Sequence, residues 1–149
     1  MPRVIRSGRL LGFAMMVVSL GVAFGIRLFT GSTMETTGAL EQISGTALYA
    51  SAFYGGLVFL QPRARAAMLA VASVGFCWAV EFFQLTDIPA RLSAHSVVAR
   101  LVLGESFDPA DLVWYVLGVA LAVGVHRWLL PAISHGYPSR CDRALPGSG

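Results

Sequence analysis

The sequence has no lysine, few charged residues and only two cysteines, and each scarcity argues against a class of protein. Charged residues make up 13% of the chain, which is about half their share in an ordinary soluble domain. Cys77 lies in an apolar segment and Cys141 in a polar tail, so the two are not expected to form a disulfide. The three histidines lack the spacing of metal ligands, and His126, beside Arg127, is expected at the inner interface of a membrane. We therefore expect neither a metal nor a cofactor.

What the chain has in abundance is apolar sequence, which accounts for 56% of its 149 residues. Four apolar segments are each about as long as the 20 residues that cross the hydrocarbon core of a bilayer. They cover about residues 10–29, 43–61, 66–85 and 112–130. The sequence therefore predicts an all-α membrane protein, with residues 1–130 forming a single domain of four transmembrane helices. Residues 131–149, rich in Pro, Gly and Ser, are expected to form a loose cytoplasmic tail.

The first apolar segment also has features of a signal peptide, because three arginines precede it. The segment is longer than the apolar region of most signal peptides, and "AFG" at residues 23–25 is a weak cleavage site. We therefore expect residues 10–29 to remain as a helix.

The arginines are distributed unevenly between the two sides that these helices define. With the N-terminus in the cytoplasm, eight arginines fall inside and three outside, as the positive-inside rule requires. This predicts an N-in, C-in multi-pass protein of the inner (plasma) membrane. With no separate basic domain, nucleic acid is not expected as a partner. The inside set is Arg3, Arg6, Arg9, Arg63, Arg65, Arg127, Arg140 and Arg143, and the outside set is Arg27, Arg91 and Arg100.

The connections between the helices carry their own signals. Pro62 predicts a tight turn that makes the second and third helices antiparallel neighbours. Residues 88–105 are too short and polar to span a membrane, and they predict a short helix in the outer interface that ends at Gly104. In "FDPADLVWYVLG", Asp108 is the expected N-cap of the fourth helix and Asp111 a possible reciprocal capping residue.

Polar side chains from all four helices are expected to meet at one depth, near the outer face. An acid at the centre of a membrane costs about 2.5 to 3.5 kcal/mol on insertion scales, and less near the interface. Glu81, near the outer end of its helix, is therefore expected to have a hydrogen-bonding partner on another helix. The candidate ligand-binding residues, chosen because helical spacing places them at this depth, are Arg27, Tyr49, Glu81, Gln84, Asp111 and Tyr115.

Three functions are open for this set of residues. The first is binding of a polar or anionic head group, such as that of an envelope lipid, because two helix N-termini and Arg27 converge there. The second is a structural role, in which the network joins the helices of an accessory subunit in a larger membrane complex. The third is an enzyme, with Glu81 kept protonated by burial and Asp111 ionised near water. No nucleophile setting or phosphate loop supports catalysis, so no catalytic residue is assigned.

A family resemblance rests on four segments: "FGIRLFTG", "GTALYA", "EFFQL" and "LGESFDPADLVWYVLG". Together they resemble the small four-helix bacterial membrane proteins grouped as domain of unknown function 2809, over about residues 13–130. Glu81 and Gln84, followed by Asp111 and Gly118, are similar, more weakly, to VanZ-like proteins. The first family implies no particular activity, and the second implies at most a function of the cell envelope at the outer leaflet of the membrane. Thr46 stands where the resemblance leads us to expect an acid, which argues against a mechanism that needs a carboxylate on the second helix.

Overall fold

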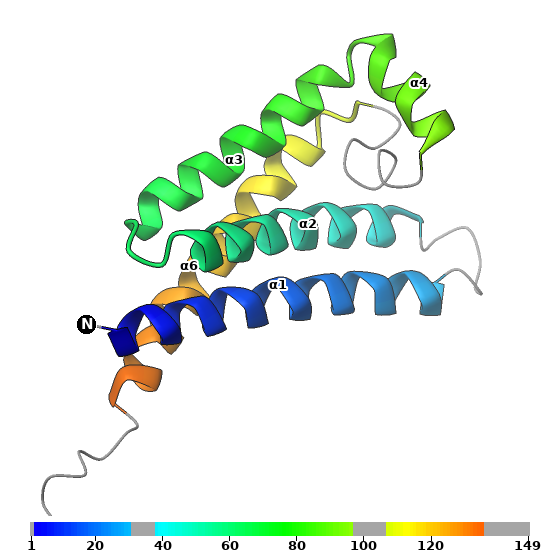
Figure 1. Cartoon of the computed structure of the whole chain (residues 1–149). Helices are drawn as coiled ribbons and strands as arrows, with labels where there is room; N and C mark the ends of the chain where they lie inside the picture. The colour runs from blue at the N-terminus through cyan, green and yellow to red at the C-terminus, as the bar shows by residue number, and fades with distance from the viewer. Residues whose placement is uncertain (1, 31–37, 97–106, 136–149) are drawn as a thin grey trace, which may run out of the picture.

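The structure is a computed structural model that describes residues 2–30, 38–96 and 107–135, and all regular structure in these ranges is helical (Figure 1). The helices are α1 (Pro2–Thr30), α2 (Gly38–Leu60), α3 (Ala66–Phe83), α4 (Asp87–His95) and α6 (Asp111–His135). Four of them are long and apolar enough to cross a membrane, over Ile5–Ile26, Gln42–Leu60, Ala66–Phe83 and Asp111–Leu129. The predicted four-helix, multi-pass membrane protein is therefore confirmed.

Several helix ends differ from the predicted ones, and α1 and α2 begin at Pro2 and Gly38, before the predicted residues 10 and 43. α6 continues through Pro131 to His135, so the beginning of the predicted loose tail is helical, while residues 136–149 lie outside the described ranges. α4 (Asp87–His95) covers the beginning of the short helix expected over 88–105, and residues 97–106, including the expected cap at Gly104, lie outside the described ranges.

α2 and α6 each pack against the other three long helices, and the contacts of α2 are the more extensive. Figure 1 shows α1 and α2 side by side, α6 crossing behind α2, and α3 above α2 at an angle to it. The turn between α2 and α3 is closed by a hydrogen bond from the Ala64 N–H to the Gln61 carbonyl oxygen, at 3.0 Å. The beginnings of α1 and α3 and the ends of α2 and α6 thus share one end of the bundle, and the opposite helix ends share the other.

Two close approaches between helices depend on glycine. A Cβ atom at Gly12 of α1 would lie 2.5 Å from the Phe59 backbone nitrogen, and one at Gly55 would lie 2.9 Å from the Gly12 oxygen. A Cβ at Gly118 of α6 would similarly meet the backbone of Ala47. These are the contacts that small residues permit between transmembrane helices.

Gly21 and Gly25 of α1 have the four-residue spacing of small residues that permits such contacts, but no other described helix of the chain approaches them. No atom lies within 4 Å of where a Cβ at either residue would be. Gly12 lies on the face of α1 that packs on α2, whereas Gly21, nine residues later, lies on about the opposite face, so spacing alone does not identify the packed face.

The apolar core lies between α2, α3 and α6, and it contains Tyr54, Val58, Leu69, Cys77 and Val119. Large apolar side chains also cover the outside of the bundle, where Leu121 is 70% exposed and Trp128 is 78% exposed. Such a surface is stable where the surrounding medium is hydrocarbon, since lipid tails are as apolar as leucine. Apolar packing in lipid therefore explains the surface and the core of the bundle, but it does not explain the polar groups in its interior.

Candidate functional site

Glu81, in the last turns of α3, is buried with only 1% of its surface exposed. Its Oε1 atom accepts a hydrogen bond from the backbone N–H of Asp108, at 2.7 Å. Its Oε2 atom accepts one from the hydroxyl of Tyr115 on α6, at 3.1 Å. A buried carboxylate is stable only when its oxygens are bonded, so these two donors account for the acid inside the bundle.

The chain enters α6 through a turn that Asp108 stabilises. Its Oδ1 atom accepts from the Ala110 N–H at 2.9 Å, which is the bond that an N-cap aspartate makes. In a capping box the residue three positions later would accept from the cap's own N–H, and here that N–H is bonded to Glu81. Glu81 of α3, rather than Asp111, therefore accepts the hydrogen bond of the Asp108 N–H.

The beginning of α2 supplies donors to both aspartates. Gln42 Nε2 donates to Asp108 Oδ2 at 2.8 Å. The Thr46 hydroxyl lies 3.1 Å from Asp111 Oδ1 and 2.9 Å from the carbonyl oxygen of Gln42, so its single proton is shared between them. Asp111 thus faces α2, and a third acid at the position of Thr46 would lie directly against it.

Aromatic side chains surround these polar groups. The rings of Tyr49 and Tyr115 meet edge to face, with their centroids 6.5 Å apart. The indole Nε1 of Trp78 on α3 donates to the Leu112 carbonyl oxygen at 3.1 Å, a further bond between α3 and the first turn of α6. Three helices are therefore held together at this end by hydrogen bonds as well as by packing.

The structure brings together four of the six candidate residues: Tyr49, Glu81, Asp111 and Tyr115. Gln84 is the half-buried C-cap of α3, and its N–H donates to the Val80 and Glu81 carbonyl oxygens. Arg27 belongs to α1, but its side chain lies outside the described part of the structure. The described cluster is thus built by α2, α3 and the beginning of α6.

Gln42 and Thr46 are the participants that the sequence analysis did not place in the site. They are four residues apart on α2, and Gln42 precedes Tyr49 by two turns and Thr46 by one, which puts all three on one helical face. That polar stripe is a signal in the sequence from which the pair can be found. Asp108, expected only as a cap, also links α2 and α3.

We call this group the carboxylate cluster. Its members are Gln42, Thr46, Glu81, Asp108, Asp111 and Tyr115. Among the described residues, the donors that reach its acids are uncharged: backbone N–H groups, an amide and two hydroxyls. Asp108 and Asp111 are partly exposed whereas Glu81 is buried. Within the described residues, no three acid, histidine or cysteine side chains are arranged to hold a metal ion.

A second polar pair lies toward the other end of the bundle. The Tyr54 hydroxyl is 2.7 Å from Nδ1 of His126, and both residues are buried, with Tyr54 0% and His126 8% exposed. His126 therefore packs inside the bundle against α2, which differs from the interface position expected from its neighbour Arg127. The pair joins α2 to α6 through a buried hydrogen bond between a phenol hydroxyl and an imidazole.

Comparison with known protein families identifies one match. The model of the family described as "Protein of unknown function (DUF2809)" matches residues 36–119. The matched range contains every member of the carboxylate cluster, whereas α1 and Arg27 precede it. The match confirms the family resemblance, and the similarity to VanZ-like proteins stays a prediction. No solved structure matches the chain.

Proposed function

The chain belongs to the DUF2809 family, and we propose that it binds the polar head group of an envelope lipid at the outer end of its helix bundle. In this proposal the N-terminus is cytoplasmic, the protein resides in the inner membrane, and the carboxylate cluster lies near the periplasmic side. Asp108 and Asp111 contact the ligand because they are partly exposed. Glu81, Tyr115 and Tyr49 support them from within the bundle.

The observation that carries the proposal is the fixed position of the two aspartates. Glu81 holds the backbone of Asp108 at 2.7 Å, Gln42 holds its carboxylate at 2.8 Å, and Thr46 lies 3.1 Å from Asp111. Binding groups that are held by a second layer of hydrogen bonds keep their geometry when a ligand arrives. A membrane protein that needed only apolar packing would not require acids at this depth.

The charge of the cluster favours a head group that donates hydrogen bonds. An anion would be attracted by the N-terminus of α6, but Asp108 and Glu81 already accept the hydrogen bonds of backbone N–H groups there. An anionic group would also face the negative charge of the cluster. Hydroxyl groups of a sugar, or an ammonium group, match the acceptors that Asp108 and Asp111 present.

A specific observation favours a second function, that of an accessory subunit in a larger membrane complex. The buried carboxylate of Glu81 has a donor on each oxygen, as expected for a polar link whose role is to hold helices together. Catalysis by Glu81 with Asp111 stays a prediction that the same variants test.

The test compares ligands and variants of the purified, full-length protein. Thermal unfolding is measured in detergent with added glucosyl-diacylglycerol, phosphatidylethanolamine or phosphatidylglycerol. We expect one of the first two lipids to raise the Tm by several degrees, since a ligand that binds only the folded state stabilises it. Asp111→Asn should abolish this shift.

Tyr54→Phe is the matched control, because it removes a buried hydrogen bond outside the cluster. It should lower the Tm of the free protein but keep the lipid-dependent shift. A shift that is the same in wild type and Asp111→Asn would refute binding at the cluster. If none of the lipids shifts the Tm, and Glu81→Gln lowers the stability of an isolated complex with another protein, the accessory-subunit function replaces it.

A further inference from the structure

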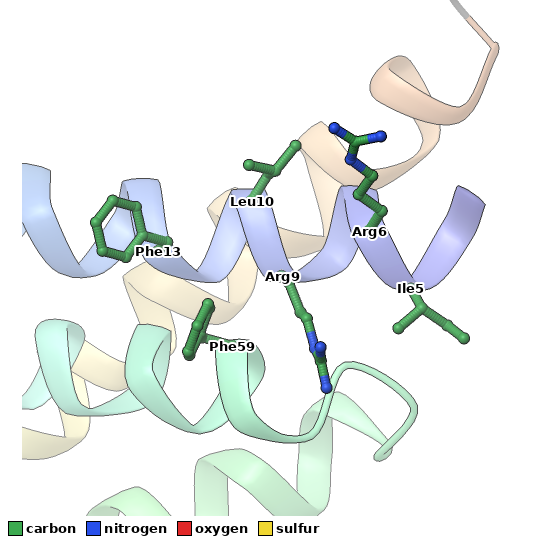
Figure 2. A pocket seen from close by; sticks show the side chains of 6 residues that line it. All are labelled: Ile5, Arg6, Arg9, Leu10, Phe13 and Phe59. Carbon is green, nitrogen blue, oxygen red and sulfur yellow. The ribbon is translucent and has the colours of Figure 1, made fainter. Parts of the chain in front are cut away.

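The opposite end of the bundle has a hollow of about 560 Å³ beside the beginning of α1. Figure 2 shows that five of its six lining residues belong to α1 and that the sixth, Phe59, comes from α2. From Ile5 to Phe13 the hollow follows about 12 Å of helix at 1.5 Å per residue. The Phe13 and Phe59 rings, with centroids 6.1 Å apart, lie side by side at its deeper end. The lining residues are Ile5, Arg6, Arg9, Leu10, Phe13 and Phe59.

The two arginines stand at the shallow end of this hollow. The candidate membrane span begins at Ile5, so Arg6 and Arg9 occupy its first two turns, while Phe13 lies deeper. In Figure 2 the guanidinium group of Arg9 extends toward the turn between α2 and α3, and that of Arg6 extends to the other side. The arginines therefore flank the hollow, in the position that long basic side chains take at the level of lipid head groups.

The described residues around the hollow add positive charge and no negative charge. Gly8 of α1 packs against Pro62, since a Cβ at Gly8 would lie 3.0 Å from that of Pro62, and the exposed Arg63 and Arg65 belong to the same turn. All the acids within residues 2–30, 38–96 and 107–135 belong to the other end of the bundle. They are Glu41, Glu81, Asp87, Asp108 and Asp111.

We propose that this hollow binds one anionic phospholipid, with its phosphate reached from opposite sides by the long side chains of Arg6 and Arg9 and an acyl chain against Leu10, Phe13 and Phe59. The apolar wall below the arginines favours a lipid over a free phosphate ion, which would leave that wall without a partner. The site is independent of the carboxylate cluster, which lies at the other end and has the opposite charge. The protein would thus select different head groups in its two leaflets.

The test uses native mass spectrometry of the full-length protein in mild detergent with dioleoyl phosphatidylglycerol or dioleoyl phosphatidylcholine. The two lipids share their acyl chains, so a difference reports the head group. We expect one phosphatidylglycerol to be retained more tightly than phosphatidylcholine. Each arginine near an anionic lipid contributes about 1 kcal/mol, so the double variant Arg6→Gln/Arg9→Gln should lose roughly 30-fold in affinity.

The matched control is Arg63→Gln/Arg65→Gln, which removes the same charge at the same end but outside the hollow's lining. It should lose less than about threefold, and Arg6→Lys/Arg9→Lys, which keeps the charge if the glutamine variant fails to fold, should lose less than about tenfold. Equal losses in the two glutamine pairs would show general electrostatic attraction and overturn the site. Displacement of the lipid by millimolar inorganic phosphate would overturn its assignment to a phospholipid.

Discussion

Replacing Glu81 by alanine should be among the most destabilising single changes in the described part of the chain. The substitution removes the acceptor of the Asp108 N–H at 2.7 Å and of the Tyr115 hydroxyl at 3.1 Å. A buried donor left without a partner costs about 1 to 3 kcal/mol. Two such donors give an expected loss of about 2 to 6 kcal/mol in the free energy of unfolding. Glu81→Gln keeps one oxygen as an acceptor and should lose about half as much.

A double-mutant cycle separates this bond energy from general damage to α3. In Glu81→Ala the hydroxyl of Tyr115 is unsatisfied, so removing it in Glu81→Ala/Tyr115→Phe should recover part of the loss. The coupling between the two residues should be about 1 to 2 kcal/mol. Tyr54→Phe deletes an equivalent buried hydroxyl that bonds to His126, and it should add to Glu81→Ala without coupling.

The measurement is reversible unfolding in mixed micelles, in which an anionic detergent replaces a mild one and helix content is followed by circular dichroism. Unfolding midpoints of the four proteins in each cycle give the coupling energies directly. If Tyr115→Phe and Tyr54→Phe both combine with Glu81→Ala additively, the Glu81–Tyr115 bond does not stabilise the protein. The reasoning from buried, satisfied donors would then be refuted.

Three further predictions concern contacts described above. Gly118→Ala should cost about 1 to 3 kcal/mol in the same unfolding assay, because the new methyl group overlaps the backbone of Ala47, whereas Gly21→Ala, with no atom within 4 Å, should cost nothing. Gly12→Ala should weaken the packing of α1 on α2 and so speed protease cleavage of the connection between the two helices. Gly21→Ala is the control, and equal cleavage rates in the two variants would contradict this. Thr46→Val should cost about 1 kcal/mol through the lost contact with Asp111, and Thr46→Asp should cost more because two acids would meet; equal midpoints for the two variants would count against the contact.

The number and length of the membrane helices follow from the sequence because each depends on one local property. A run of about 20 apolar residues satisfies its own backbone as a helix, whatever lies beside it. The turn at Pro62 and the cap at Asp108 are equally local. The end of α6 does not follow from such local signals. The composition after residue 130 predicts a loose tail, but α6 continues through Pro131 to His135.

The depth argument identifies part of the candidate site for a similar reason. Rise per residue places Glu81 and Tyr115 at one level, and the structure joins them by a hydrogen bond. Depth does not identify which faces meet, and the helix packing that decides this is a long-range property. The same limit explains why Gly21 and Gly25 lie off the packed face.

The bond between Glu81 and the Asp108 amide joins residues 27 positions apart in the chain. This bond holds together the two ends of the segment that runs from the end of α3 to the beginning of α6. A segment whose ends are held together can change in length at small entropic cost, because each doubling of the number of its residues adds only about 0.6 kcal/mol to the free energy of loop closure. The number of residues between these two points can therefore change while the end of α3 and the beginning of α6 keep their positions.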